Sequence, residues 1–287
     1  MTERPFHIAL LRPEGYPHAS ALTEAVEYLA HALTACGHRA RIAENVLDSA
    51  AHNIIACAHL MAPAAVDQLP RDVIVLNGEP LSHADDWQFT AGTYHRALER
   101  AYIWDYSQSN LARLPHARVS VIPFWYRREL VRAQLPRVPG ESLLFYGVLT
   151  PHRRRVLAEL AAHSVTVDVM YGVYGEPRDR AMRASLAVLN VKKRDEDDGP
   201  FEAIRCFHPL INEVPVISED TTDPTADPFR NSVVFVPRAG FSTAVAAQLA
   251  DRRAFLARQV EAVRAFAALD PLPAIAAAVE SYLRSRA

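Results

Sequence analysis

Apolar runs and helix-like stretches follow one another in turn along this chain. In the first half, the apolar runs predict strands at residues 6–11, 39–43, 53–58, 72–76, 101–104 and 119–123. Between the first two runs, an apolar helix face is formed by Leu22, Val26, Leu29 and Leu33. We expect Ser20 to cap this helix and Gly37 to follow its last turn. Another helix is predicted at 86–100, before the fifth strand.

The alternation restarts in the second half of the chain. Strands are predicted at 143–146, 166–170, 186–191, 215–218 and 232–236. The intervening stretches predict helices at 152–163, at 178–185, from 201 onward, and from 241 to the end. Strands that alternate with helices indicate parallel sheets, so we predict an α/β protein with two Rossmann-like domains facing a cleft.

Domain boundaries follow from where the pattern breaks. We expect an N-terminal domain at 1–125 and a linker at 126–141, because that segment is rich in charge and proline. A second domain then spans 142–264. The final helical segment, 265–287, is expected to pack back on the N-terminal domain.

Composition narrows the possible partners and compartment. The 287 residues carry a formal charge of −2, so no global field attracts nucleic acid or an anionic membrane, and we expect no nucleic-acid partner. No stretch approaches the roughly 20 apolar residues of a spanning helix, so no membrane span is predicted. The sparse cysteines, Cys36, Cys57 and Cys206, are typical of a reducing compartment and predict a cytoplasmic protein.

Familiar nucleotide and hydrolase motifs are absent from the sequence. The ten glycines include no G-x-G-x-x-G fingerprint, which argues against NAD or FAD as a cofactor. There is also no G-x-x-x-x-G-K-[ST] loop. The G-x-S-x-G elbow of α/β-hydrolases is missing too, so a serine triad would lack its nucleophile.

An anion site is predicted where the first strand of the second half ends. The segment LLFYGVLTPHRRR places Gly147 after the strand, Thr150 as a helix cap and Pro151 as the first helical residue. Free N–H groups at a helix start favour an anion, and the arginines at 153–155 add phosphate donors. A diphosphate would fit this position. The alternative is a solvated basic first turn.

A carboxylate follows a later strand of the same half. Glu202 and Arg205 lie three residues apart, on one face of a predicted helix. Glu202 at this edge could accept both hydroxyls of a ribose; alternatively, the two residues form a surface ion pair. Ser218, Glu219 and Asp220 end the next strand and could meet the same ligand.

Polar residues also follow strands in the first half. Glu79 and Asp105 each come at a strand end, and His59 follows the strand at 53–58. Either acid could serve as general base for an acceptor hydroxyl, and we take Glu79 and Asp105 as the candidate catalytic residues. His59 and His18 are weaker candidates. Each of the four could instead be a structural hydrogen-bonding residue.

The charged run KKRDEDDG, residues 192–199, could suggest a metal site. A run of mixed charge between a strand and a helix is more typical of a solvated loop. We therefore predict no bound metal.

Together these segments resemble compact bacterial glycosyltransferases of the GT-B fold, near glycosyltransferase families 1 and 4. In the first half the resemblance depends on LNGEPL, YHRALERAYIWDYSQSN and VSVIPFWY. In the second half it depends on LLFYG-x-x-x-x-x-RR, LAVLNV and FEAIRCFHPLINEVPVISED. The final segment AAQLADRRAFLARQVEAVRAF is similar to the C-terminal helices of the family.

The resemblance implies a nucleotide-sugar donor in the second half and an unknown acceptor in the first, with no further cofactor and no metal. It implies that the diphosphate meets the Gly147 turn and Arg153 or Arg154. The donor pocket would be completed by Glu202 at the ribose, together with Arg205, Asn190 and Ser218.

Two departures from the family pattern bear on the reaction. Many retaining members have a second glutamate eight residues after the first, where this chain has Leu210; the nearest acid is Glu213. The turn RPEGYPHAS also lacks the paired glycines often found there. The expected function is transfer of a sugar to an acceptor. A non-catalytic relative that binds a nucleotide-sugar or a partner, and a sugar-nucleotide epimerase, are the alternatives.

Overall fold

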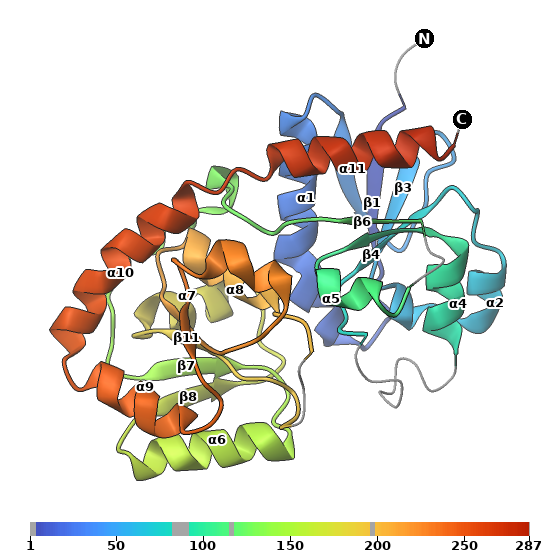
Figure 1. Cartoon of the computed structure of the whole chain (residues 1–287). Helices are drawn as coiled ribbons and strands as arrows, with labels where there is room; N and C mark the ends of the chain where they lie inside the picture. Colours follow the sequence, from blue (N-terminus) through green and yellow to red (C-terminus); the bar gives the residue numbers. More distant parts are fainter. Residues whose placement is uncertain (1–3, 82–91, 115–117, 196–198, 287) are drawn as a thin grey trace. The chain divides into compact units, whose positions relative to one another are not determined.

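The chain forms two compact units, each with its own parallel sheet. The computed structural model describes residues 4–81, 92–114, 118–195 and 199–286. The first unit contains Met1–Glu129 and Asp270–Ala287, and the second contains Leu130–Leu269. This architecture confirms the predicted α/β class with two domains (Figure 1).

Among the described residues of the first unit, six parallel strands form one sheet in the order β2-β1-β3-β4-β5-β6. The strands are β1 (Phe6–Leu10), β2 (Ala40–Glu44), β3 (His52–Ala56), β4 (Ile74–Asn77), β5 (Tyr102–Asp105) and β6 (Arg118–Val121). Each lies within two residues of the apolar run that predicts it. The apolar runs of the sequence therefore predicted the strands of this sheet.

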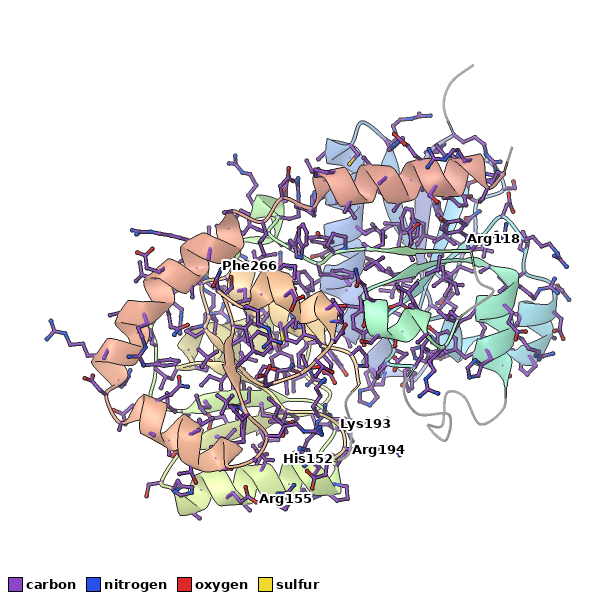
Figure 2. The ribbon with its side chains drawn as sticks, viewed as in Figure 1. Arg118, His152, Arg155, Lys193, Arg194 and Phe266 are labelled. Atoms are coloured by element: carbon purple, nitrogen blue, oxygen red, sulfur yellow. The ribbon has the colours of Figure 1, made fainter. Side chains whose placement is uncertain are left out.

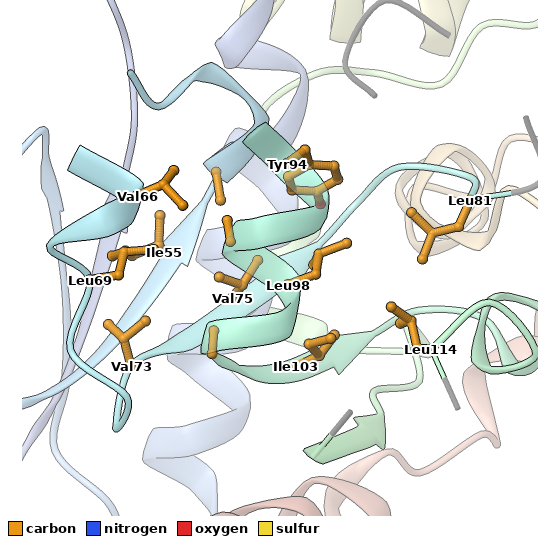
Figure 3. Close-up of a cluster of buried hydrophobic side chains, with 13 residues drawn as sticks. Ile55, Val66, Leu69, Val73, Val75, Leu81, Tyr94, Leu98, Ile103 and Leu114 are labelled. Carbon is orange, nitrogen blue, oxygen red and sulfur yellow. The ribbon is translucent and has the colours of Figure 1, made fainter. Parts of the chain in front are cut away.

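The chain winds one way across the sheet from β1 to β2 and the other way from β3 to β6. The connecting helices therefore cover both faces of the sheet. One face carries α1 (Thr23–Ala35) and α11 (Leu272–Arg284), which contact each other. The other carries α2 (Pro63–Asp67) and α4 (Thr93–Arg100). Under α2 and α4 lies a buried apolar cluster that includes Ile55, Val75, Tyr94, Leu98 and Ile103 (Figure 3).

The second unit repeats the arrangement with five parallel strands in the order β11-β10-β9-β7-β8, counted over its described residues. They are β7 (Leu143–Tyr146), β8 (Val167–Met170), β9 (Val188–Asn190), β10 (Val216–Glu219) and β11 (Val234–Val236). Its helices are α6 (Pro151–Ala162), α7 (Glu176–Ala184), α8 (Ala203–Ile211), α9 (Phe241–Leu249) and α10 (Arg252–Ala267). Its main apolar core includes Phe145, Leu160, Leu189, Val245 and Phe255.

Both sheets have the same topology when strands are numbered within each unit. In each, the first strand lies between the second and the third, and later strands follow outward from the third. The chain therefore changes direction between β1 and β3 in one sheet, and between β7 and β9 in the other. Ligands of open α/β sheets bind beyond the carboxyl ends of the strands at such a switch point.

Most of the predicted linker, from residue 130 onward, is part of the second unit. Residues 130–141 belong to the second unit, where Arg132 N–H donates to Asn212 Oδ1 at 2.7 Å. The guanidinium of Arg137 donates to the backbone oxygens of Arg183, Ser185 and Leu186, at and just after the end of α7. Burial, with a further contribution from the charge of Arg183, lowers the pKa of Arg137 to about 10.

The end of the chain returns to the first unit. Helix α11 contacts α1 and β6, and the Tyr282 hydroxyl donates to the Asp72 oxygen at 2.7 Å. Residues 252–284 are the one described stretch long and apolar enough to cross a membrane. They comprise α10 and α11, which are separate helices, and α11 buries Ile275, Val279 and Tyr282 within the first unit.

Several local predictions need correction. Ser20 does not cap α1, because a 3₁₀ turn at Pro17–Leu22 precedes that helix and Leu22 occupies the cap position. Gly37 does follow the helix as predicted, with φ of 90°, and His38 N–H donates to Leu33 O. The helix predicted at 86–100 is present as α4, but its first part, 86–91, lies outside the described residues.

Candidate functional site

The turn after β7 leads directly into the capped start of α6. Gly147 adopts φ of 140°, a value that L side chains rarely adopt. Thr150 caps α6 by accepting a hydrogen bond from the N–H of Arg153, and Pro151 is the first helical residue. The cap and the helix start are thus those predicted from the sequence.

This turn leaves backbone donors unused. Among hydrogen bonds between described residues, none is donated by the N–H groups of Val148, Leu149 or Thr150. Val148 is 52% exposed, so the turn is accessible to solvent. Unused N–H groups next to the positive end of a twelve-residue helix favour a bound anion. The geometry can therefore accept phosphate oxygens.

The arginines of α6 have different surroundings. Arg153 is 4% exposed, and its guanidinium donates to the backbone oxygens of Val148, Val191 and Lys192. It therefore connects the turn to the segment that follows β9. Arg154 is exposed, and no bond to its side chain occurs among the described residues. Of the two arginines predicted to meet a diphosphate, Arg154 is the one free to reach a ligand.

Glu202 and Arg205 form an ion pair above the same turn. Arg205 Nε donates to Glu202 Oε2 at 2.5 Å, and Arg205 Nη1 donates to the Tyr146 oxygen at 2.5 Å. Burial alone would raise the pKa of the Glu202 carboxyl, but the charges of Arg205, Arg153 and Lys192 outweigh it and leave the pKa lowered. The Glu202 side chain is 19% exposed, so this ionised carboxylate is still partly accessible.

Arg205 also explains why residue 147 is a glycine. A Cβ atom at position 147 would lie 2.9 Å from Arg205 Nη1 and 3.7 Å from Arg153 Nη1. Two guanidinium groups therefore lie close against the turn. The charge of these groups adds to the attraction that the unused N–H groups exert on an anion.

Asn190, the last residue of β9, lies beside Ser218, the residue before the end of β10. Asn190 Nδ2 donates to Ser218 Oγ at 3.0 Å, and both residues are almost fully buried. The Oδ1 atom of Asn190 has no hydrogen-bond partner among the described residues. The structure thus brings these two predicted residues together, beneath the surface.

Cations and acids gather beside the first turn of α6. Lys193 and Arg194 lie next to His152 at the N-terminal end of this helix (Figure 2). Thr150 Oγ1 donates to the Lys193 oxygen at 2.6 Å, and Arg155 pairs with Asp195 at 2.8 Å. Of the charged run at 192–199, residues 196–198 lie outside the described residues.

In the first unit, Asp105 is enclosed at the end of β5. Its carboxylate accepts hydrogen bonds from Asn77 Nδ2 at 2.7 Å, Asn110 Nδ2 at 2.9 Å and the Ser107 N–H at 2.8 Å. Its exposed fraction is zero. These surroundings fit a residue that organises strand ends, and a catalytic role for Asp105 stays a prediction.

Glu79 is the more accessible of the two candidate bases. Its side chain is 28% exposed, and Oε1 lies 3.7 Å from His59 Nδ1. Burial lowers the pKa of His59 to about 4, so at neutral pH the contact is between a carboxylate and a neutral imidazole. His18 lies elsewhere, against the ring of Tyr16. Glu79 and His59 are therefore the candidate pair that the structure brings together.

Solved structures resemble the chain along nearly its whole length, although no protein-family model and no curated protein sequence matches it. AviGT4, a glycosyltransferase involved in avilamycin A biosynthesis, is 17% identical with a TM-score of 0.57, and the match covers 98% of each chain. The sucrose-phosphate synthase of Thermosynechococcus elongatus is 13% identical with a TM-score of 0.58, over 99% of each chain.

T4 phage BGT, in complex with UDP and Mn²⁺, is 10% identical with a TM-score of 0.59, over 98% of this chain and 99% of that one. The chain therefore has the two-domain α/β fold of GT-B glycosyltransferases, as its sequence predicts. At these identities, the likeness establishes the fold alone, and the chemistry has to be argued from the site.

Proposed function

We propose that the chain is a glycosyltransferase that transfers a sugar from a nucleotide-sugar donor to an acceptor hydroxyl. The observation that carries the proposal is the turn at 147–150. There, unused N–H groups and nearby guanidinium groups lie at the β7/β9 switch point. A diphosphate is the anionic group that this combination suits best.

In the donor site, the N–H groups of the turn would donate hydrogen bonds to the diphosphate oxygens. The exposed side chain of Arg154 would add a positive charge. Glu202, ionised and partly exposed, would accept the ribose hydroxyls. As the bond between the sugar carbon and the diphosphate oxygen breaks, negative charge grows on the leaving group. Fixed N–H dipoles stabilise this charge without reorganising, which is the largest contribution the protein can make.

On the acceptor side, the proposal assigns the base to Glu79, with His59 beside it. The acceptor hydroxyl attacks the anomeric carbon, its proton passes to the base, and the diphosphate leaves with the bonding electrons. Burial lowers the pKa of His59 to about 4, so its imidazole is a weak base at neutral pH and Glu79 is the residue assigned to take the proton. No resident cofactor is part of the proposal.

Two further expectations belong to the proposal. Transfer without a bound metal is one, because fixed cations already surround the turn. A cytoplasmic location is the other, since the three cysteines are free.

The donor site can be tested by calorimetric titration with UDP, GDP and their sugars. We expect at least one to bind, and no binding by any of them would exclude the proposal. Glu202→Ala should weaken nucleotide binding by about 1–3 kcal/mol through lost charged hydrogen bonds. Glu176→Ala is the control, because Glu176 is an exposed acid on α7 that, among the described residues, pairs with Arg180 one turn away. Equal affinities of the two variants would refute the role of Glu202.

A non-catalytic binding protein is the second candidate, and one observation favours it. Leu210 occupies the position of the second glutamate of many retaining relatives, and it is only 2% exposed. A screen of acceptors with radiolabelled donor separates the candidates, because a binding protein yields neither transfer nor donor hydrolysis. An epimerase would instead release an altered sugar with no acceptor.

A further inference from the structure

Glu219 is the last residue of β10. Its carboxylate contacts both the start of α6 and the segment that follows β9. Its side chain is 1% exposed. Oε1 accepts a hydrogen bond from His152 Nε2 at 2.9 Å, and Oε2 accepts one from the Lys192 N–H at 2.6 Å. His152 belongs to the first turn of α6, and Lys192 follows β9. One carboxylate thus connects the helix start to the neighbouring strand end.

The orientation of His152 is fixed from both sides. Arg155 Nη2 lies 3.0 Å from His152 Nδ1, and a guanidinium can only donate. Nδ1 therefore accepts this bond, and Nε2 donates to Glu219. The acid Asp195 also lies 3.4 Å from Nδ1, on the same side as Arg155.

Other bonds bring the same two segments together, but they come from the α6 side. Thr150 Oγ1 donates to the Lys193 oxygen, and Arg153 Nε donates to the Val191 oxygen. Glu219 differs because it reaches the segments from a third strand. It therefore limits how far the turn at 147–150 can move relative to the sheet.

We infer that Glu219 is a positioning residue, which acts through His152 to hold the turn N–H groups in the geometry that accepts a diphosphate. This inference depends on the proposed function. Glu219 is too buried to meet the ligand itself. Its contribution should therefore appear in phosphate binding and be absent from nucleoside binding.

The chain offers a matched control for loss of a buried histidine–carboxylate pair. Asp179 Oδ1 lies 3.0 Å from His208 Nε2, and both residues are almost fully buried in the same unit. This pair connects α7 and α8 and contacts none of the residues at 147–150 by hydrogen bond. Asp179→Asn should therefore lower stability without altering phosphate binding.

The experiment measures affinities of UDP and uridine for the wild type, Glu219→Gln, His152→Leu, His152→Gln and Asp179→Asn. We expect Glu219→Gln and His152→Leu each to weaken UDP binding by about tenfold and to change uridine binding by less than about twofold, since one charged hydrogen bond is lost. A further variant that combines Glu219→Gln with His152→Leu should bind UDP no more weakly than Glu219→Gln alone, because Glu219 acts on the turn through His152.

His152→Gln is the conservative rescue, because its amide can still donate to Glu219, and it should bind UDP nearly as the wild type does. If Glu219→Gln binds UDP as well as the wild type, or if uridine binding falls equally, the inference is wrong and the proposed function stands. If His152→Leu fails to fold, His152→Gln and Glu219→Gln still decide the matter. A wild type that binds no nucleoside diphosphate overturns both.

Discussion

The carboxyl edges of the two sheets share one topology but differ in how their polar groups are used. At the edge of the first sheet, Asp105 receives donors from Asn77, Ser107 and Asn110, so the strand ends satisfy one another. At the edge of the second sheet, the turn at 147–150 keeps N–H groups unused and has guanidinium groups beside it. Position at a strand end therefore does not define a ligand site by itself. What marks the second edge is that its unused N–H groups lie beside two guanidinium groups.

We expect the polar groups at the first edge to contribute more to folding stability than those at the second edge. Asp105→Ala removes a buried carboxylate and leaves three donors without their acceptor. We expect a loss of about 3–5 kcal/mol in the stability of the first unit, with UDP affinity unchanged. Thermal unfolding followed by circular dichroism, alongside calorimetry with UDP, would measure both. Asp105→Asn should lose less. If Asp105→Asn unfolds normally but abolishes sugar transfer, Asp105 is a base and the contrast between the edges is wrong.

Acid should weaken the first unit through His59. Its pKa is about 4 in the folded protein and about 6.5 when unfolded, so the unfolded chain binds more protons between these values. Stability is then complete above pH 6.5 and falls as the pH drops toward 4, by about 3 kcal/mol in total. Chemical denaturation at several pH values in this window would measure the slope. His59→Gln should flatten it; an unchanged slope would assign the acid sensitivity to other groups.

The sequence predicts the strands of both sheets because buried parallel strands are continuous apolar runs, as in β1 and β7. It also predicts the capped start of α6, since Thr150 and Pro151 act locally. It does not reveal that Arg153 is tied to Val191, because that contact joins segments distant in the chain. The bonds of Glu219 to His152 and Lys192 are hidden for the same reason.

The second edge can be perturbed at Gly147. An added Cβ would meet Arg205 Nη1 at 2.9 Å, on a backbone with φ of 140°. Gly147→Ala should therefore cost about 1–3 kcal/mol in backbone strain and displace the guanidinium, lowering UDP affinity together with stability. Gly175→Ala is the control, because its φ is also positive, at 62°, while its Cβ would meet nothing within 4 Å. Equal UDP affinities in the two variants would show that the turn is not the phosphate site.

The smallest effect is expected at Arg154, and it sharpens the comparison because it concerns charge alone. This guanidinium is exposed and has no bond among the described residues, so its removal should leave stability unaltered. Arg154→Ala should weaken UDP binding by roughly threefold at low salt, and the difference should shrink as added salt screens exposed charges. Arg180→Ala, an exposed arginine on α7 paired with Glu176, serves as the control and should not change UDP affinity. A loss of UDP affinity that does not depend on salt would mean that Arg154 contacts the diphosphate directly, with water excluded. An unchanged UDP affinity would mean that the backbone N–H groups and the buried guanidinium groups bind the diphosphate without Arg154.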